Sequence, residues 1–258
     1  MTPQYLEAIA ALLAAIAWPL VVVVFVLTQR RPLTEVLNKL EEITLPGGIG
    51  AKLRREVDKS AETTLESDPD AAWKAPTEEQ IEAAQRVEQV ASRSDISVVR
   101  TQVLELAQEY ERLRVAGVAG DQRRRWQVVV IKMRALARAA YDLLPELKDS
   151  ESPGERLAAI AILQVRPNPD YLDWLAKRVT EERPFIGYQA AEALRAAVRN
   201  LGPPHYAKLR KAIEVARNPV GPQTIYAHPE RDNILEEVEE ELKEAIGPRN
   251  KGAGDDIT

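Results

Sequence analysis

Residues 152–165 read SPGERLAAIAILQV, and this stretch decides the class of fold. Ser152 supplies an N-cap hydroxyl, Pro153 suits the first helical position, and Glu155 completes a capping box. The run that follows is almost entirely apolar and contains neither glycine nor proline. The stretch therefore predicts a helix that begins at Pro153 and ends near Val165.

A related stretch follows it in the sequence. AIAIL at 159–163 and AAEAL at 190–194 align at an offset of 31 residues, and each is followed by a proline-containing turn and another helix. The second helices of the two pairs are predicted over 169–179 and 203–217, and the helix around 190–194 is predicted over 184–201. This pattern is typical of stacked helical hairpins, in which small alanines allow close approach. Two hairpins are too few for a free-standing solenoid, so the earlier helices must cap the stack.

The same region resembles a known class of helical module. The strings that carry the likeness are EYERLR, SPGERLAAIAILQ, YLDWLAKRV and ERPFIGYQAAEALRAAV. They are similar to the inner helices of HEAT-like repeats, and residues 99–215 look like an uncharacterised bacterial module that appears with signalling and conflict-system proteins. The resemblance implies protein–protein association in a signalling or defence setting, and it carries over no catalytic residues.

The rest of the chain also favours helices. Alanine, leucine, glutamate and arginine are abundant, glycine and aromatic residues are sparse, and no Val/Ile/Thr alternation bounded by turns is found. The absence of cysteine excludes disulfides, thiolate metal sites and a thiol nucleophile. We therefore expect an all-α fold. Further helices are predicted over 51–62, over 78–91 with a Thr77–Gln80 capping box, over 96–115 with Asp95 as cap, over 121–144 and over 233–246.

An uncharged apolar run begins at Ala8 and ends at Leu27, AIAALLAAIAWPLVVVVFVL. About 20 residues at about 1.5 Å each give about 30 Å, the thickness of the hydrocarbon core of a bilayer. Residues 8–27 are therefore predicted to form a single transmembrane helix, with the lipid bilayer as its partner. Pro19 lies in the middle of this run, where a kink is expected.

The basic residues predict the orientation of this helix. No Lys or Arg precedes Ala8, whereas Arg30, Arg31 and Lys39 follow Leu27 closely. Because basic residues stay on the cytoplasmic side, we expect the N-terminus outside and the following domain in the cytoplasm. The localisation predicted in this way is the bacterial inner (plasma) membrane, with a single pass.

Four parts are predicted along the chain. Residues 1–31 form the anchor, and 32–76 form a juxtamembrane amphipathic helix followed by a linker at 63–76. Residues 77–217 form the helical HEAT-like domain. An acidic helix and a disordered tail follow at 218–258, where four basic and ten acidic residues from Val220 onward give a net charge of −6.

The candidate binding residues lie in the one basic segment. Residues 112–138 contain eight basic side chains against Asp121 alone, a net charge of +7. On a helix over 121–144, Arg123, Arg134 and Arg138 fall within about 60° of each other beside the apolar face, at 100° per residue. Such a flank can contact an acidic partner, a nucleotide or an anionic lipid. The exposed side of residues 185–198 is the expected neighbouring surface.

No catalytic or metal-binding pattern is found in the sequence. His205 and His228 are separate and lack metal-ligand spacing, and the carboxylate pairs on charged helices have no serine, histidine or glycine-rich context. We therefore expect no enzymatic activity, no metal and no cofactor. Nucleic acid is not an expected partner, because the chain is acidic overall and no reading motif is present. Four aromatic residues, Tyr171, Trp174, Phe185 and Tyr188, are expected to fill the seam between the hairpins.

These features predict a membrane-anchored helical interaction module that binds a cytoplasmic protein as an adaptor, scaffold or sensor. Two alternatives stay open. In one, the chain is an oligomerising membrane effector whose kinked span disrupts the bilayer, which makes a homo-oligomer the partner. In the other, the arginine flank binds an anionic nucleotide or lipid and the chain acts as its sensor.

Overall fold

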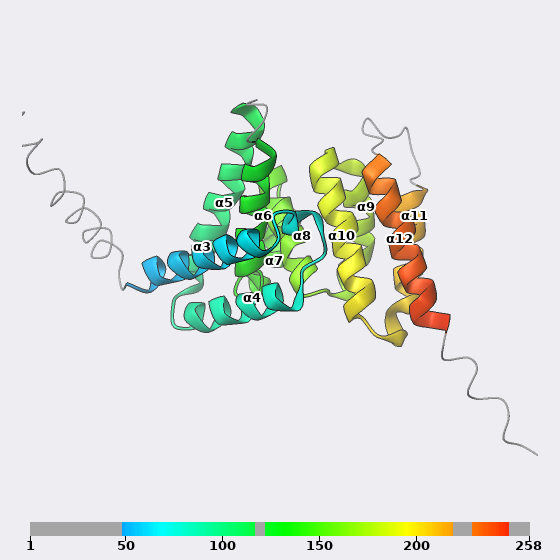
Figure 1. Cartoon of the computed structure of the whole chain (residues 1–258), viewed down its shortest axis with the longest axis horizontal. Coiled ribbons are helices and arrows are strands. Elements are labelled where there is room, and N and C mark those ends of the chain that lie inside the picture. The colour runs from blue at the N-terminus through cyan, green and yellow to red at the C-terminus, as the bar shows by residue number, and fades with distance from the viewer. Residues whose placement is uncertain (1–47, 117–121, 219–228, 248–258) are drawn as a thin grey trace, which may run out of the picture. The chain divides into compact units, whose positions relative to one another are not determined.

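The structure is a computed structural model that describes residues 48–116, 122–218 and 229–247 (Figure 1). All regular elements in these ranges are helices, which confirms the all-α fold class. None of these helices is both long enough and apolar enough to cross a bilayer. The predicted span at 8–27 and the predicted amphipathic helix at 32–43 lie outside the described residues.

The chain divides into two compact units, Met1–Ala51 and Lys52–Thr258. The first lies almost entirely outside the described residues, so the fold is that of the second. In it, α8 (Pro153–Val165) and α10 (Pro184–Asn200) are the two most completely buried helices. The other helices pack around this pair.

The N-terminal part of the unit consists of α3 (Ile49–Ser67), the 3-10 helix η1 (Ala71–Trp73) and α4 (Glu78–Ala91). This differs from the predicted linker at 63–76. The acidic residues that indicated a linker build a turn instead, in which Asp68 accepts a hydrogen bond from the N–H of Asp70 at 3.0 Å. The alanines that follow in η1 are buried, so this segment is part of the core.

Helix α5 (Ile96–Ala116) packs against both α6 (Gln122–Leu136) and α8. The predicted N-terminal caps of α4 and α5 are confirmed. The hydroxyl of Thr77 accepts from the N–H of Gln80 at 3.4 Å, and the carboxylate of Asp95 accepts from the N–H of Ser97 at 2.8 Å. Both signals act over two or three residues, which is why the sequence alone reveals them.

The prediction of one helix over 121–144 is wrong. Helix α6 ends at Leu136, and a turn leads to η2 (Tyr141–Leu143) and to the short α7 (Leu144–Lys148). Turn-type bonds replace the α-helical ladder here: the N–H of Ala137 bonds to the carbonyl of Arg134 at 3.1 Å, and that of Leu143 bonds to the carbonyl of Ala140 at 2.9 Å. The apolar side chains of the turn, η2 and α7 are nevertheless buried, which is why their spacing resembled a continuing helix face.

The start signals downstream are confirmed. Ser152 accepts from the N–H of Glu155 at 3.3 Å at the start of α8, and Asn168 accepts from the N–H of Asp170 at 2.9 Å. The elements that follow α8 are η3 (Pro169–Tyr171), α9 (Leu172–Glu181), α10, η4 (Pro203–His205), α11 (Tyr206–Arg217) and α12 (Pro229–Ile246). Helix α12 begins earlier than the predicted position, Asn233.

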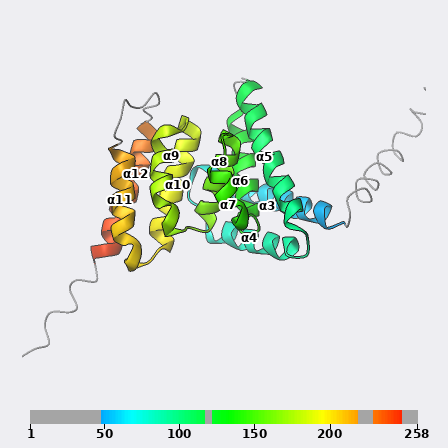
Figure 2. The same cartoon turned by 180° about the vertical axis from the view of Figure 1, so that it is seen from behind.

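Helices α8, α9, α10 and α11 pack against one another in the C-terminal half of the unit. Helix α8 lies against α10, and α9 lies against both α10 and α11 (Figures 1 and 2). Helices α5, α6 and α7 cover α8 from one side, while α12 covers α10 and α11 from the other. Both helices of the first predicted hairpin pack against α10, and other helices of the chain lie on both flanks; the repeat itself stays a prediction.

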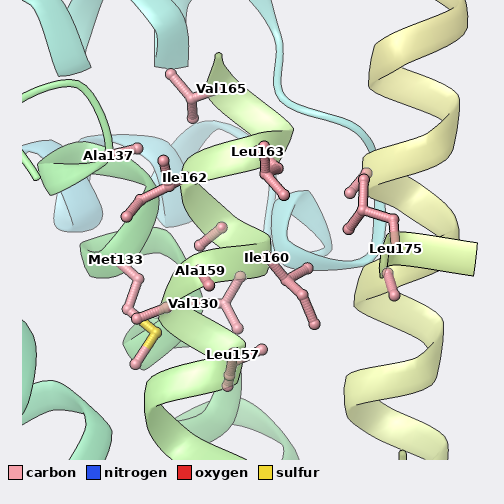
Figure 3. Close-up of a cluster of buried hydrophobic side chains, with 14 of the residues drawn as sticks. Val130, Met133, Ala137, Leu157, Ala159, Ile160, Ile162, Leu163, Val165 and Leu175 are labelled. Atoms are coloured by element: carbon pink, nitrogen blue, oxygen red, sulfur yellow. The ribbon is translucent and has the colours of Figure 1, made fainter. Parts of the chain in front are cut away.

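Helix α8 forms the centre of the apolar core, and its side chains are buried on all sides. Figure 3 shows Val130 and Met133 of α6 beside it, with Leu175 of α9 on another side. Each fully buried aliphatic side chain contributes about 1.5–3 kcal/mol. Two glycines permit the closest backbone approaches: Gly154 of α8 lies against α5, and Gly187 of α10 lies against α9.

Replacing Gly154 tests the packing of α8 against α5. A Cβ atom at Gly154 would lie 2.3 Å from the backbone oxygen of Ala107, so Gly154→Ala must push the two helices apart. We expect a loss of about 1–3 kcal/mol in the free energy of unfolding, measured by urea denaturation. Gly202→Ala is the matched control, because the nearest atom to its Cβ is 3.8 Å away. Equal effects of the two substitutions would contradict this packing.

Candidate binding site

Five aromatic rings from four separate elements meet at one place, and we call them the aromatic cluster. Its members are Trp73 of η1, Tyr110 of α5, Trp126 of α6, and Phe185 and Tyr188 of α10. Phe185 is central, with ring centroids 5.3 Å from Trp73, 5.1 Å from Trp126 and 5.9 Å from Tyr110. Phe185 and Tyr110 are buried, whereas Trp73, Trp126 and Tyr188 are half-buried, so the cluster reaches the surface.

The backbone that carries Trp73 is held by side chains of α6 and α10. Two donors of Arg134 bind the carbonyl oxygens of Ala71 at 2.8 Å and Lys74 at 2.9 Å. Gln189 donates to the carbonyl of Ala72 at 2.8 Å, and the hydroxyl of Tyr188 donates to that of Trp73 at 2.5 Å. Four consecutive carbonyl groups are thus satisfied by distant side chains, which fixes Trp73 in the cluster.

Arg134 itself is only 1% exposed. Its Nε donates to the side-chain oxygen of Gln164 at 2.7 Å, and Nη2 donates to that of Gln189 at 3.3 Å. Burial lowers the pKa of Arg134 to about 10, so the guanidinium group remains charged at neutral pH. A buried charge is tolerated only where its donors are used, and this network uses them.

The nearby carboxylate of Glu192 is also buried. One oxygen lies 3.5 Å from a nitrogen of Arg195, and the other has no hydrogen-bond partner among the described residues. Burial raises the pKa of Glu192, while the positive charges of Arg195 and Arg134 oppose this shift. Glu192 thus lies beneath the aromatic cluster as an incompletely satisfied group.

The three arginines nominated from the sequence do not lie together on one exposed flank. Arg134 is inside the unit, and Arg138 pairs with Glu88 of α4 at 2.7 Å. Arg123 alone is exposed without a carboxylate partner in the described part of the chain, and its guanidinium carbon lies 4.3 Å from the centroid of the Trp73 ring. Helical geometry alone predicted that the arginine flank of this helix would face solvent. In the structure, η1 and α4 pack against α6 and cover part of that flank.

The expected surface at 185–198 also differs from the structure. Helix α10 is covered by α8, α9, α11 and α12, and most of its side chains are buried. The aromatic residues expected at the seam separate as well. Phe185 and Tyr188 belong to the aromatic cluster, whereas Trp174 faces the guanidinium group of Arg178, 5.8 Å from the ring centroid.

The structure adds one arginine that the sequence analysis missed. Arg183 directly precedes α10, two residues before Phe185, and its side chain is exposed without an ion pair among the described residues. Its charge acts on Tyr110, whose pKa is raised mainly by burial and lowered slightly by Arg183. We call Arg123 and Arg183 the arginine rim.

The acidic side chains nearest to the rim are used within the fold. Glu111 pairs with Arg114 at 2.9 Å and accepts from the N–H of Gly154 at 3.0 Å. Glu182 is buried between Arg156 and Arg178. These pairs use the carboxylates of Glu111 and Glu182 within the fold, so neither group neutralises the arginine rim.

The aromatic cluster also contains two unsatisfied donors. The indole N–H groups of Trp73 and Trp126 are buried and have no acceptor among the described residues. An unpaired buried donor costs about 1–3 kcal/mol. Because both N–H groups are buried, an external partner cannot reach them, and the surface of the patch consists of the half-buried rings and the arginine rim.

The described residues do not form any of the other sites considered from the sequence, such as a metal site. No group of three or more His, Asp or Glu side chains there could hold a metal ion. His205 is half-buried in η4, and His228 lies outside the described residues. The Glu181–Glu182 pair has arginine partners at both positions and serves the contact between α8, α9 and α10.

Comparisons of this chain with protein-family models, with curated proteins and with solved structures find no match. The HEAT-like resemblance therefore stays a prediction.

Removing the Arg134 donors should unfold η1 and weaken the whole unit. Arg134→Met keeps an unbranched side chain but leaves the carbonyl of Lys74 and the side-chain oxygen of Gln164 without a donor, and leaves the carbonyl of Ala71 with only the N–H of Lys74 at 3.4 Å. Since each buried acceptor left without a donor costs about 1–3 kcal/mol, we expect a loss of about 2–5 kcal/mol in the free energy of unfolding, measured by urea denaturation with tryptophan fluorescence. Arg124→Met, at an exposed position of the same helix, should change it by less than about 0.5 kcal/mol. Similar values for both variants would show that the network is not needed.

The raised pKa of Glu192 gives a pH-dependent prediction. Because the folded chain holds this proton more tightly than the unfolded chain, the stabilisation is present below the unfolded pKa and is lost as pH rises through the folded pKa. Glu192→Gln removes this titration, so the variant should gain melting temperature relative to wild type as pH rises from about 4 to about 8. The exposed Glu236→Gln is the control. A difference that does not vary with pH would refute the shift.

Proposed function

We propose that this chain is a membrane-anchored α-helical interaction module, an adaptor, scaffold or sensor, that binds an acidic surface of a protein at the aromatic cluster and arginine rim. The observation that carries the proposal is the coincidence of two features in one patch. Half-buried rings reach the surface, and two exposed arginines lack carboxylate partners within the described residues.

The residue types of the patch support protein binding. Tryptophan, tyrosine and arginine provide most of the binding energy at protein interfaces, where they lie in the centre of the contact. Arg123 lies over the ring of Trp73, which orients the guanidinium group and leaves its edge available for a carboxylate. An acidic partner would supply the carboxylates that the two guanidinium groups of the rim lack.

The rigidity of the patch supports the same proposal. Trp73 is held through its backbone by Tyr188 and through its neighbours by Arg134 and Gln189. A surface that is already ordered loses less conformational entropy when a partner binds. The network beneath the cluster therefore favours affinity without contacting the partner.

The membrane anchor is part of the proposal and rests on the sequence of residues 8–27. Tethering would place the patch at a limited distance from the bilayer and raise its local concentration relative to other membrane-bound proteins. The HEAT-like resemblance and the side-by-side packing of α8 with α10 and α9 with α11 agree with a scaffold.

Charge reversal at the rim tests the proposal. Full-length chain carrying Arg123→Glu and Arg183→Glu should recover a specific acidic protein from native membranes at least about tenfold less efficiently than wild type, because the contact becomes repulsive. Arg86→Glu with Arg93→Glu is the matched control, since both arginines are exposed elsewhere. Melting temperatures establish that all variants fold.

The outcomes separate the alternatives. Loss of one protein in the rim variant, with its retention in the control, supports the proposal. Equal recovery of every protein in both variants overturns it. Loss of binding to vesicles of anionic lipid, without loss of any protein, would favour the lipid-sensor alternative instead.

A further inference from the structure

Helix α12 has two sets of acidic side chains with different roles. The inward set bonds to the adjacent helices: Glu241 accepts from Arg195 at 2.9 Å and from Arg199 at 2.8 Å, and Glu237 also pairs with Arg195. Glu239 pairs with an arginine of α11. These contacts hold α12 against α10 and α11.

The outward set consists of Glu236, Glu240 and Glu244, which we call the acidic stripe. All three are exposed, and the one ion pair of the stripe within the described residues joins Glu240 to Lys243 of the same helix at 2.8 Å. They are four residues apart, so they lie on one face about 6 Å from each other, an arrangement in which like charges destabilise a helix. The stripe borders an open depression of about 490 Å³ whose lining also includes Arg195 of α10.

The acidic stripe cannot reach the arginine rim of its own chain. Inward residues of α12 are fixed to Arg195 and Arg199, near the C-terminal end of α10. Arg183 and Phe185 lie at the N-terminal end of the same helix, and the ten residues from Phe185 to Arg195 correspond to about 15 Å along its axis. One rigid helix therefore keeps the two charged surfaces apart.

Resting on the proposed function, we propose that the acidic partner of the arginine rim is the acidic stripe of α12 on a second copy of this chain. The stripe offers carboxylates, which only accept hydrogen bonds, to a patch with two exposed guanidinium groups that have no carboxylate partner among the described residues. The charges are opposite, and both surfaces belong to the same compact unit.

The two surfaces differ, so the association is head to tail. Each copy binds one neighbour through its rim and another through its stripe, which produces rings or open chains rather than a closed two-fold dimer. Copies anchored in one bilayer would meet at a raised effective concentration, so a weak contact suffices.

Two charge-reversed variants and their mixture test this inference. The rim variant carries Arg123→Glu and Arg183→Glu, and the stripe variant carries Glu236→Lys, Glu240→Lys and Glu244→Lys. Sedimentation velocity of full-length chain in neutral detergent at low salt should show concentration-dependent association for wild type. Each variant alone should associate at least about tenfold more weakly, because its two surfaces then have the same sign.

An equimolar mixture of the two variants should associate again. The negative rim of one variant meets the positive stripe of the other, and the unchanged surfaces also match each other. The control for the rim is Arg86→Glu with Arg93→Glu, and the control for the stripe reverses Glu62, Glu66 and Glu82, which are exposed on α3 and α4. Both controls should associate like wild type, and high salt should weaken every association.

The results distinguish this inference from the proposed function. A monomeric wild-type chain overturns the inference, and the proposed function still stands if the rim variant loses a different protein in native membranes. Wild-type association that neither variant weakens, or that the mixture fails to restore, also overturns the inference. Restoration by the mixture supports it, because an interface elsewhere on the chain would not respond to paired charge reversal.

Discussion

The buried guanidinium group of Arg134 is the interaction on which the rest of the structure depends. It lies where η1, α6, α8 and α10 meet, and it donates to carbonyl oxygens of η1 and to the side chains of Gln164 and Gln189. A charge in this position is stable only while all these acceptors surround it. The same requirement holds the four elements in one arrangement, so Arg134 couples the N-terminal helices to the central pair.

The candidate site follows from that coupling. Because Arg134, Gln189 and Tyr188 hold the backbone of η1, Trp73 is placed against Phe185 and under the guanidinium group of Arg123. The ring positions satisfy the packing but leave two indole N–H groups without acceptors in the described part of the chain. Both N–H groups are buried, so they remain an internal cost of about 1–3 kcal/mol each, and a partner can contact only the half-buried rings and the arginine rim.

Helix caps could be predicted from the sequence, whereas contacts between residues far apart in the chain could not. The caps at Thr77, Ser152 and Asn168 bond to residues two or three positions away, so their helices could be predicted. Trp73 and Tyr188 are 115 residues apart, and Trp73 lay in a stretch whose acidic and proline residues indicated a linker. The end of α6 was missed because buried residues after Leu136 continued the apolar spacing through a turn.

Charge counts along the sequence located the charged segments correctly. They overestimated how many of these side chains are available to a partner. Of the three arginines on the predicted flank of α6, one supports the core, one pairs with Glu88, and Arg123 is left for a partner. Arg183 lay outside the basic segment and gained its role only when α10 brought it beside the aromatic cluster. On α12 the same division separates glutamates that bind α10 and α11 from the exposed stripe. The charges that the fold does not use are opposite in sign and lie on different parts of one compact unit, and this arrangement favours binding between copies over binding within one.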